Sequence, residues 1–261
     1  MVSVQIDSEV FDLAESVNEL SKDQLLRLCE LLDTLALSKE HQIKALHILF
    51  NLKWYKFRLA YLFAIKLDVL HIKKLLPYTD FLYNQAQLDI NKIPSHKGLY
   101  GPKSRLENIT FYEFIKAENY FTDYIKKGEI QALDKLIALL YREKKAKFNP
   151  KTDQDIRQPF NDMSHQWRVK EVARWQKKYK QAILLFYHSA RKNLIDLIPK
   201  SKISKSTQNK IHYTWIHVMD DLAGNVIHID QVGNMNVYTI LFSYGKRIRE
   251  MEAQNEKLKK L

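Results

Sequence analysis

Apolar residues recur at intervals of three and four along most of this chain, which is the spacing of one face of an α-helix. Two capping boxes, Ser21-Lys-Asp-Gln24 and Thr110-Phe-Tyr-Glu113, each precede such a stretch. Gly128 follows the second stretch, at the place where a helix stops. Gly and Pro number only six each in 261 residues, too few for the turns of a strand-rich fold.

We therefore predict an all-α fold, a multi-helix bundle in two loosely divided parts, with at most a short strand at the N-terminal sequence VSVQI. The polar, proline-containing residues 143–160 are predicted to link an N-terminal helical part, 1–142, to a C-terminal part, 161–261, that ends in a long helix. The most apolar stretch, residues 38–66, is predicted to form a central buried helix or a broken pair.

The sequence GLYGPKS, residues 98–104, contains the residue types of a phosphate-binding loop without its spacing. Pro102 also removes an amide donor where a phosphate would need one, so a turn leading into the helix at Thr110 is favoured. The histidines do not share a helical face at metal-binding spacing, and the single cysteine, Cys29, lies among leucines as a small buried residue would. We predict no catalytic residue, no metal and no cofactor, and hence no enzyme.

A net charge of +12 attracts nucleic acid, an anionic membrane or an acidic protein, or merely reflects a lysine-rich surface. No apolar run is long enough to span a membrane. Basic and aromatic residues come closest together in 168–180, followed by a basic loop at 200–210. Candidate nucleic-acid-binding residues there are Lys170, Arg174, Lys177, Lys178, Lys202 and Lys205. The competing interpretation is an amphipathic helix with its lysines outward and its tryptophans inward.

The last helix carries a heptad seam whose members are Val237, Leu241, Tyr244, Ile248, Met251, Asn255 and Leu258. Either the seam joins another helix, with Asn255 at an a position, or it packs on its own domain with Asn255 at the wet end. Aromatic residues surround the helix that begins after Thr110, more than one face can bury. Candidate partner-binding residues are therefore Tyr112, Tyr120, Tyr124, Ile248, Met251 and Asn255.

Several stretches, in this order, resemble a group of proteins from phages and prophages of Bacteroidetes. They are NELSKDQLLRLCELL, the Gly-Pro turn at 101–102, LENITFYEFIKAENYF, LDKLIALLYR, IRQPFND, KQAILLFYHSARKNLI and NVYTILFSYGKRIREMEAQNEKL. Where that group often has proline after the Leu-Tyr-Arg run, this chain has Glu143.

The resemblance implies a tail-assembly or baseplate-assembly factor, a class that includes chaperones of the long tape-measure protein. We accordingly expect a non-enzymatic, cytoplasmic adaptor, possible retention in the particle, a protein client from the tail or baseplate, and a possible homo-oligomer through the C-terminal helix. The alternative function is that of a basic helical nucleic-acid-binding protein, and no membrane partner is expected.

Overall fold

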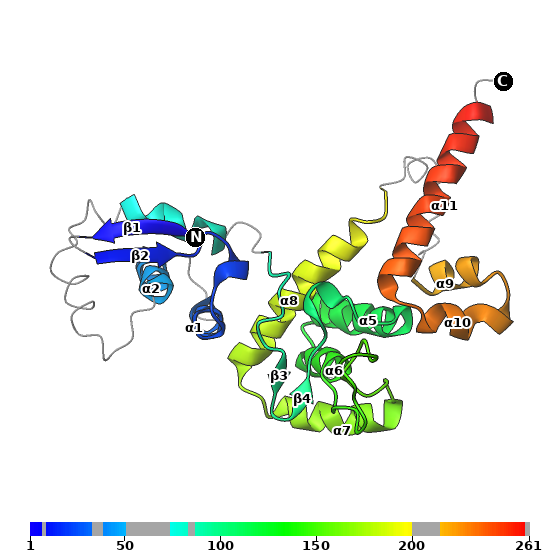
Figure 1. Cartoon of the computed structure of the whole chain (residues 1–261), viewed down its shortest axis with the longest axis horizontal. Helices are drawn as coiled ribbons and strands as arrows, with labels where there is room; N and C mark the ends of the chain where they lie inside the picture. The colour runs from blue at the N-terminus through cyan, green and yellow to red at the C-terminus, as the bar shows by residue number, and fades with distance from the viewer. Residues whose placement is uncertain (7–8, 33–38, 51–73, 83–86, 200–214, 259–261) are drawn as a thin grey trace. The chain divides into compact units, whose positions relative to one another are not determined.

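The computed structural model describes residues 1–6, 9–32, 39–50, 74–82, 87–199 and 215–258 (Figure 1). The described part is mostly helical, with two small antiparallel sheets of two strands each, so the predicted helical class is confirmed. The chain forms two compact units. Unit 1 comprises Met1–Ile93 and Trp175–Ser189, and unit 2 comprises Pro94–Arg174 and Ala190–Leu261.

These two units do not follow the predicted division of the chain. Residues 143–160, predicted to be a linker, lie within unit 2, and Arg157 of that segment is buried. Residues 161–174 belong to the same unit as 94–142, and the chain passes between the units within the helix α8, Lys177–Ile195. The polar composition predicted a linker. Composition does not reveal that residues far away in the sequence bury this segment.

Unit 1 begins with an antiparallel hairpin rather than a lone strand. Strand β1, Val2–Ile6, pairs with β2, Glu9–Leu13. A 3₁₀ turn, Val17–Glu19, precedes helix α1, Lys22–Leu32, and helix α2 spans Lys39–Leu49. A 3₁₀ segment, η3, spans Leu76–Leu82. The core of the unit includes Leu13, Leu20, Leu25, Leu28, Ala45 and Leu49.

The first predicted capping box is present in α1. The amide of Gln24 donates to the Ser21 hydroxyl at 3.2 Å, and the amide of Ser21 donates to the Gln24 side chain at 2.9 Å. The Gln24 side chain also donates to the carbonyls of Ile48 and Leu49, which ties the start of α1 to the end of α2. Cys29 is buried as predicted, and burial raises the pKa of its thiol to about 12. Of the helix predicted over 38–66, α2 covers the first part, and residues 51–73 lie outside the described residues.

Unit 2 opens with a hairpin that the sequence did not predict. Strands β3, Ser95–His96, and β4, Leu99–Tyr100, are joined by Lys97 and Gly98, both with positive φ, of 48° and 79°. Two consecutive residues with positive φ form the turn type that joins such strands tightly. Tyr100 then exchanges backbone hydrogen bonds of 2.7 and 3.0 Å with Arg142. The glycine-containing stretch therefore makes a hairpin that holds the backbone of Arg142.

The helices of unit 2 surround a second core. Figure 1 shows α5 and α6 packed side by side, with α7 next to α6. Phe111 and Phe114 of α5 meet the edge of Trp215 at ring-centroid distances of 6.4 and 5.1 Å. Short 3₁₀ turns occur at Ser104–Leu106 and Val226–His228. The helices are α5, Phe111–Lys127; α6, Ile130–Leu140; α7, Asp162–Ala173; the end of α8; α9, Trp215–Ala223; α10, Ile229–Asn234; and α11, Val237–Leu258.

Both ends of α5 match the sequence pattern. The Thr110 hydroxyl accepts from the amide of Glu113 at 3.2 Å, and Gly128 ends the helix with a φ of 68°. The carboxylate of Glu113 binds arginine side chains instead of closing the capping box. Next to this start, Phe111 donates its amide to the carbonyl of Met235 at 2.9 Å, which joins α5 to the segment before α11.

Replacing Thr110 with Ala should lower the free energy of unfolding of unit 2 by about 1 kcal/mol, because the amide of Glu113 loses its acceptor. Urea unfolding followed by circular dichroism measures this loss. Thr110→Ser keeps the hydroxyl and should retain most of the stability. Equal losses in both variants would show that the methyl group, and not the cap, is what matters.

Candidate functional site

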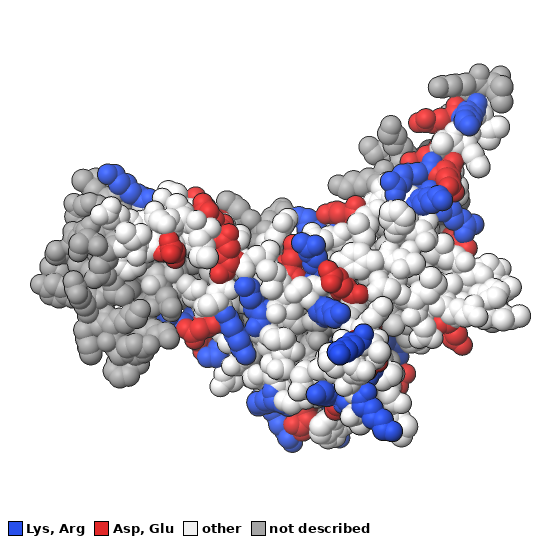
Figure 2. All heavy atoms as spheres, viewed as in Figure 1, with Lys and Arg blue, Asp and Glu red and all other residues white. Residues whose placement is uncertain are grey.

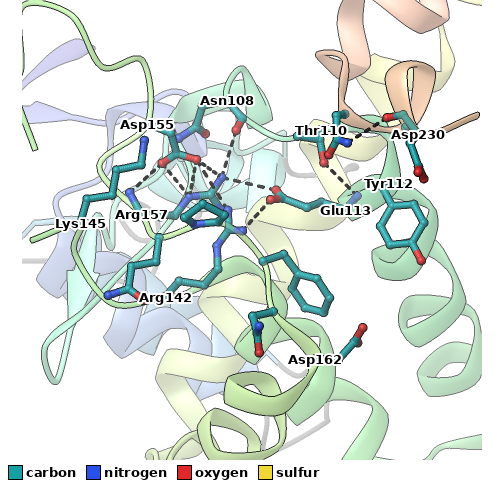
Figure 3. Close-up of a pocket in the computed structure, with 16 residues that line it drawn as sticks. Asn108, Thr110, Tyr112, Glu113, Arg142, Lys145, Asp155, Arg157, Asp162 and Asp230 are labelled. Carbon is teal, nitrogen blue, oxygen red and sulfur yellow. Dashed lines mark hydrogen bonds and ion pairs between the residues drawn. The ribbon is translucent and has the colours of Figure 1, made fainter. Parts of the chain in front are cut away.

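A polar pocket of about 530 Å³ lies at the start of α5 (Figure 3). Two arginines and two carboxylates meet beside it. Arg142 donates to Glu113 at 2.6 Å, and Arg157 binds Asp155 through two nitrogens at 3.0 and 2.7 Å. Weaker ion pairs of 3.6 Å join Arg142 to Asp155 and Arg157 to Glu113. We call these four residues the ion cluster.

The ion cluster connects segments that are distant in the sequence. Arg157 also donates to the carbonyls of Leu140, at 2.8 Å, and Asn108, at 3.1 Å. The cluster therefore joins the end of α6, the segment before α5 and the segment before α7. The side chains of Arg142 and Arg157 are almost completely buried. Each guanidinium therefore needs the carboxylate that it binds, Glu113 for Arg142 and Asp155 for Arg157.

The charges of the ion cluster shift the pKa values of Asp155 and Arg142. Burial raises the pKa of Asp155, but the hydrogen bonds and charge of Arg157 outweigh burial and hold that pKa below its ordinary value. Burial, together with the charge of Arg157, lowers the pKa of Arg142, against the pairing with Glu113. Both carboxylates are engaged by arginines, and within the described part of the chain no three His, Cys, Asp or Glu residues gather as a metal site would require.

Replacing Arg157 with Met should lower the free energy of unfolding of unit 2 by about 3–5 kcal/mol, because it removes one buried charge and leaves its partner carboxylates under-compensated. Thermal and urea unfolding measure the change. The matched control is Arg174→Met, since Arg174 is exposed and pairs only with Glu171, and this variant should lose less than about 0.5 kcal/mol. Similar losses in the two variants would contradict a structural role for the ion cluster.

A second concavity, of about 510 Å³, is a groove between α5, α6 and α7. Its floor holds the ring of Tyr120 stacked on that of His165, with centroids 5.6 Å apart and planes within 11°. The Nε2 atom of His165 lies 3.0 Å from the carbonyl oxygen of Lys135, which fixes the imidazole. The groove is lined by Tyr120, Gln131, Asp134, Lys135, Asp162, His165, Gln166, Val169, Lys170 and Ala173.

The aromatic pair in this groove is uncharged at neutral pH. Burial lowers the pKa of His165, although its hydrogen bond to the Lys135 carbonyl opposes the change. Burial also raises the pKa of Tyr120, so its phenol stays protonated. A neutral aromatic floor favours an apolar side chain of a ligand over an ion.

Large apolar side chains are exposed on α6 and α7, two of the helices that line the groove. Ile130, Met163 and Trp167 are 69%, 85% and 54% exposed, and each is adjacent in the sequence to a residue that lines it. Two exposed cations, Lys135 and Lys170, belong to the lining. The lining also contains two carboxylates, of which Asp134 is buried and Asp162 pairs with Lys116 at 2.7 Å.

The structure distributes the predicted partner-binding residues over three places. Tyr120 lies in the groove, whereas Tyr112 is 45% exposed and lines the polar pocket. Tyr124 is half-buried. Ile248 is buried within unit 2, while Met251 and Asn255 are exposed farther along α11. Contact of any of them with a partner stays a prediction.

The predicted nucleic-acid-binding residues do not form one helical face. α7 ends at Ala173 and α8 begins at Lys177, so Lys170 and Arg174 belong to unit 2 and Lys177 and Lys178 to unit 1. Lys178 also pairs with Glu30 at 3.3 Å. Lys202 and Lys205 lie outside the described residues. Figure 2 shows Lys and Arg interspersed with Asp and Glu on the visible face.

The tryptophans of this region also differ from the predicted amphipathic pattern, in which both point inward. Trp175 is buried, but Trp167 is exposed on α7. The sequence did not predict a role for His165, the exposure of Trp167 or the ion cluster. The signal for Trp167 was its spacing of four residues from Met163, which places both on one side of α7.

Comparisons with protein-family models, with curated proteins and with solved structures found no match to this chain. Among the described helices, none combines the length and apolar character needed to cross a membrane. The functional inference therefore rests on the geometry of the groove and its surroundings.

Lowering the pH from 7.5 to 5.5 should destabilise unit 2, because the lowered pKa of His165 means that the unfolded chain binds a proton more readily than the folded one. The stabilisation is complete above the unfolded pKa of about 6.5 and is lost as the pH falls below it. His165→Gln should reduce this pH dependence in urea unfolding. His47 in unit 1 also has a pKa lowered by burial, so the pH dependence of unit 1 should remain in this variant. An unchanged pH dependence in the variant would contradict the assignment to His165.

Proposed function

We propose that the protein is a non-enzymatic adaptor or assembly protein that binds a protein client in the groove between α5, α6 and α7. The observation that carries this proposal is the set of exposed apolar side chains, Ile130, Met163 and Trp167, on two of the helices that line a concave surface with a neutral aromatic pair. Burying a tryptophan and two aliphatic side chains against a client supplies the kind of contact that dominates protein interfaces.

The chemistry of the client follows from the groove. An amphipathic helix fits a concavity between helices, with an apolar side chain placed over Tyr120 and Val169. Acidic residues flanking that side chain would meet Lys135 and Lys170. Both pairings are satisfied by a helical protein that alternates apolar and acidic positions.

The setting of the proposal comes from the resemblance described above. It implies assembly of a phage tail or related contractile apparatus, where the client would be a helical tail or baseplate component such as the tape-measure protein.

The absence of an enzyme activity is part of the same proposal, and two features support it. The carboxylates of the ion cluster are held by arginines, and the residues lining the groove include no serine, threonine or cysteine nucleophile.

The experiment is a binding titration of the full chain against helical segments of the proposed client, a tape-measure or other long helical tail protein. Trp167→Ala and Tyr120→Ala should each weaken binding by about tenfold or more, as expected of anchor residues. The matched control is Phe242→Ala, because Phe242 is 62% exposed on α11 and does not line the groove. Equal weakening by the control, or no binding to any segment, would contradict the proposal.

A salt titration with the same proteins separates this function from nucleic-acid binding. Affinity for the client should change little between 50 and 300 mM salt if apolar contacts dominate, whereas affinity for DNA would fall by roughly two orders of magnitude or more. Duplex DNA and the helical segments are therefore titrated in parallel. Tight binding to DNA that survives Trp167→Ala would favour the alternative function.

A further inference from the structure

The heptad seam of α11 extends beyond the part of unit 2 that covers it. Val237, Leu241 and Ile248 are buried, whereas Met251 and Leu258 are 44% and 68% exposed and Asn255 is exposed between them. Figure 1 shows the C-terminal half of α11 (red) extending away from α9 and α10. The same face that packs on the domain at its first half is therefore open at its second half.

The covered half explains why the open half is helical. Gly245 permits close packing against the segment after α8, since a Cβ at this position would lie 3.1 Å from the carbonyl oxygen of Leu197. This packing, together with the buried seam residues, offsets the free-energy cost of nucleating helix α11. The exposed turns of α11 consequently need no further ordering before they meet another helix.

The polar residues on the exposed turns of α11 suit pairing with an identical helix from a second copy of the chain. With Asn255 at position a, Met251 and Leu258 occupy d, Arg247 occupies g and Glu252 occupies e. In a parallel pair in register, the two Asn255 side chains face each other and can hydrogen-bond, and Arg247 of each chain lies opposite Glu252 of the other. In an antiparallel pair, Asn255 would face the apolar Met251. One Nη of Arg247 donates to the Asp221 carbonyl, which leaves further donors of the guanidinium for such a pair.

We propose that α11 pairs with α11 of a second copy of this chain, parallel and in register, through Met251, Asn255 and Leu258. The seam is short, so the interface belongs to the weak, concentration-dependent class. Such contacts become effective when many copies gather on one assembly, because their effective concentration is then high. This inference is independent of the groove and its client.

The test is an engineered disulfide in the full chain. Cys29 is the single cysteine of the chain and is buried, so the unmodified protein serves as the blank. In Asn255→Cys the two thiols meet only in a parallel pair in register. Under mild oxidation this variant should form covalent dimers about tenfold faster or more than Ala253→Cys, whose thiol lies at position f on the far side of the helix. Equal rates in the two variants would overturn the proposal.

Sedimentation at protein concentrations on the order of 100 µM provides the second measurement, since weak interfaces associate in that range. Met251→Glu should abolish self-association, because it places a charge in the seam on both copies. Asn255→Ile should strengthen it about tenfold or more, because it replaces the polar a residue with an apolar one. Self-association that Met251→Glu leaves intact, or a chain that stays monomeric even with Asn255→Ile, would refute the pairing.

Discussion

Two arginines buried beside two carboxylates constrain how unit 2 is built. Arg142 and Arg157 are charged side chains with almost no exposed surface, and each is satisfied only if Glu113 and Asp155 are in place. The additional hydrogen bonds of Arg157 to the Leu140 and Asn108 carbonyls link the end of α6 and the segment before α5. Because Glu113, Arg142 and the Asp155–Arg157 pair come from three different segments, the ion cluster forms only when those segments are assembled correctly.

The groove depends on this arrangement. Glu113 fixes the first turn of α5, and Tyr120 lies two turns farther along the same helix. The segment that carries Asp155 and Arg157 leads directly into α7, which supplies His165 and Trp167. The hydrogen bond between His165 and the Lys135 carbonyl then closes α7 onto α6. The groove is thus supported by polar contacts on one side and by the apolar core on the other.

Features set by neighbouring residues could be predicted from the sequence, and features set by distant ones could not. The caps at Ser21 and Thr110 and the stop at Gly128 need only residues within one turn, and all three are confirmed. The burial of Arg157 depends on Glu113, so composition alone gave a linker at 143–160. The break between α7 and α8 carries no Gly or Pro, which is why the basic residues seemed to share one face. For the groove, Tyr120 could be predicted as a candidate partner-binding residue, but its stacking on His165 needed the packing of α5 against α7.

The central claim is that a helical protein binds in the groove between α5, α6 and α7. Site-specific photo-cross-linking in cells that co-express the proposed client, a long helical tail protein, tests it most directly, with the reactive side chain placed at position 167 or, as a reference, at position 242. The account predicts cross-links from position 167 to the long helical tail protein and few or none from position 242. Cross-links to that protein from 242 alone, or none from 167 while both variants stay folded, would contradict it.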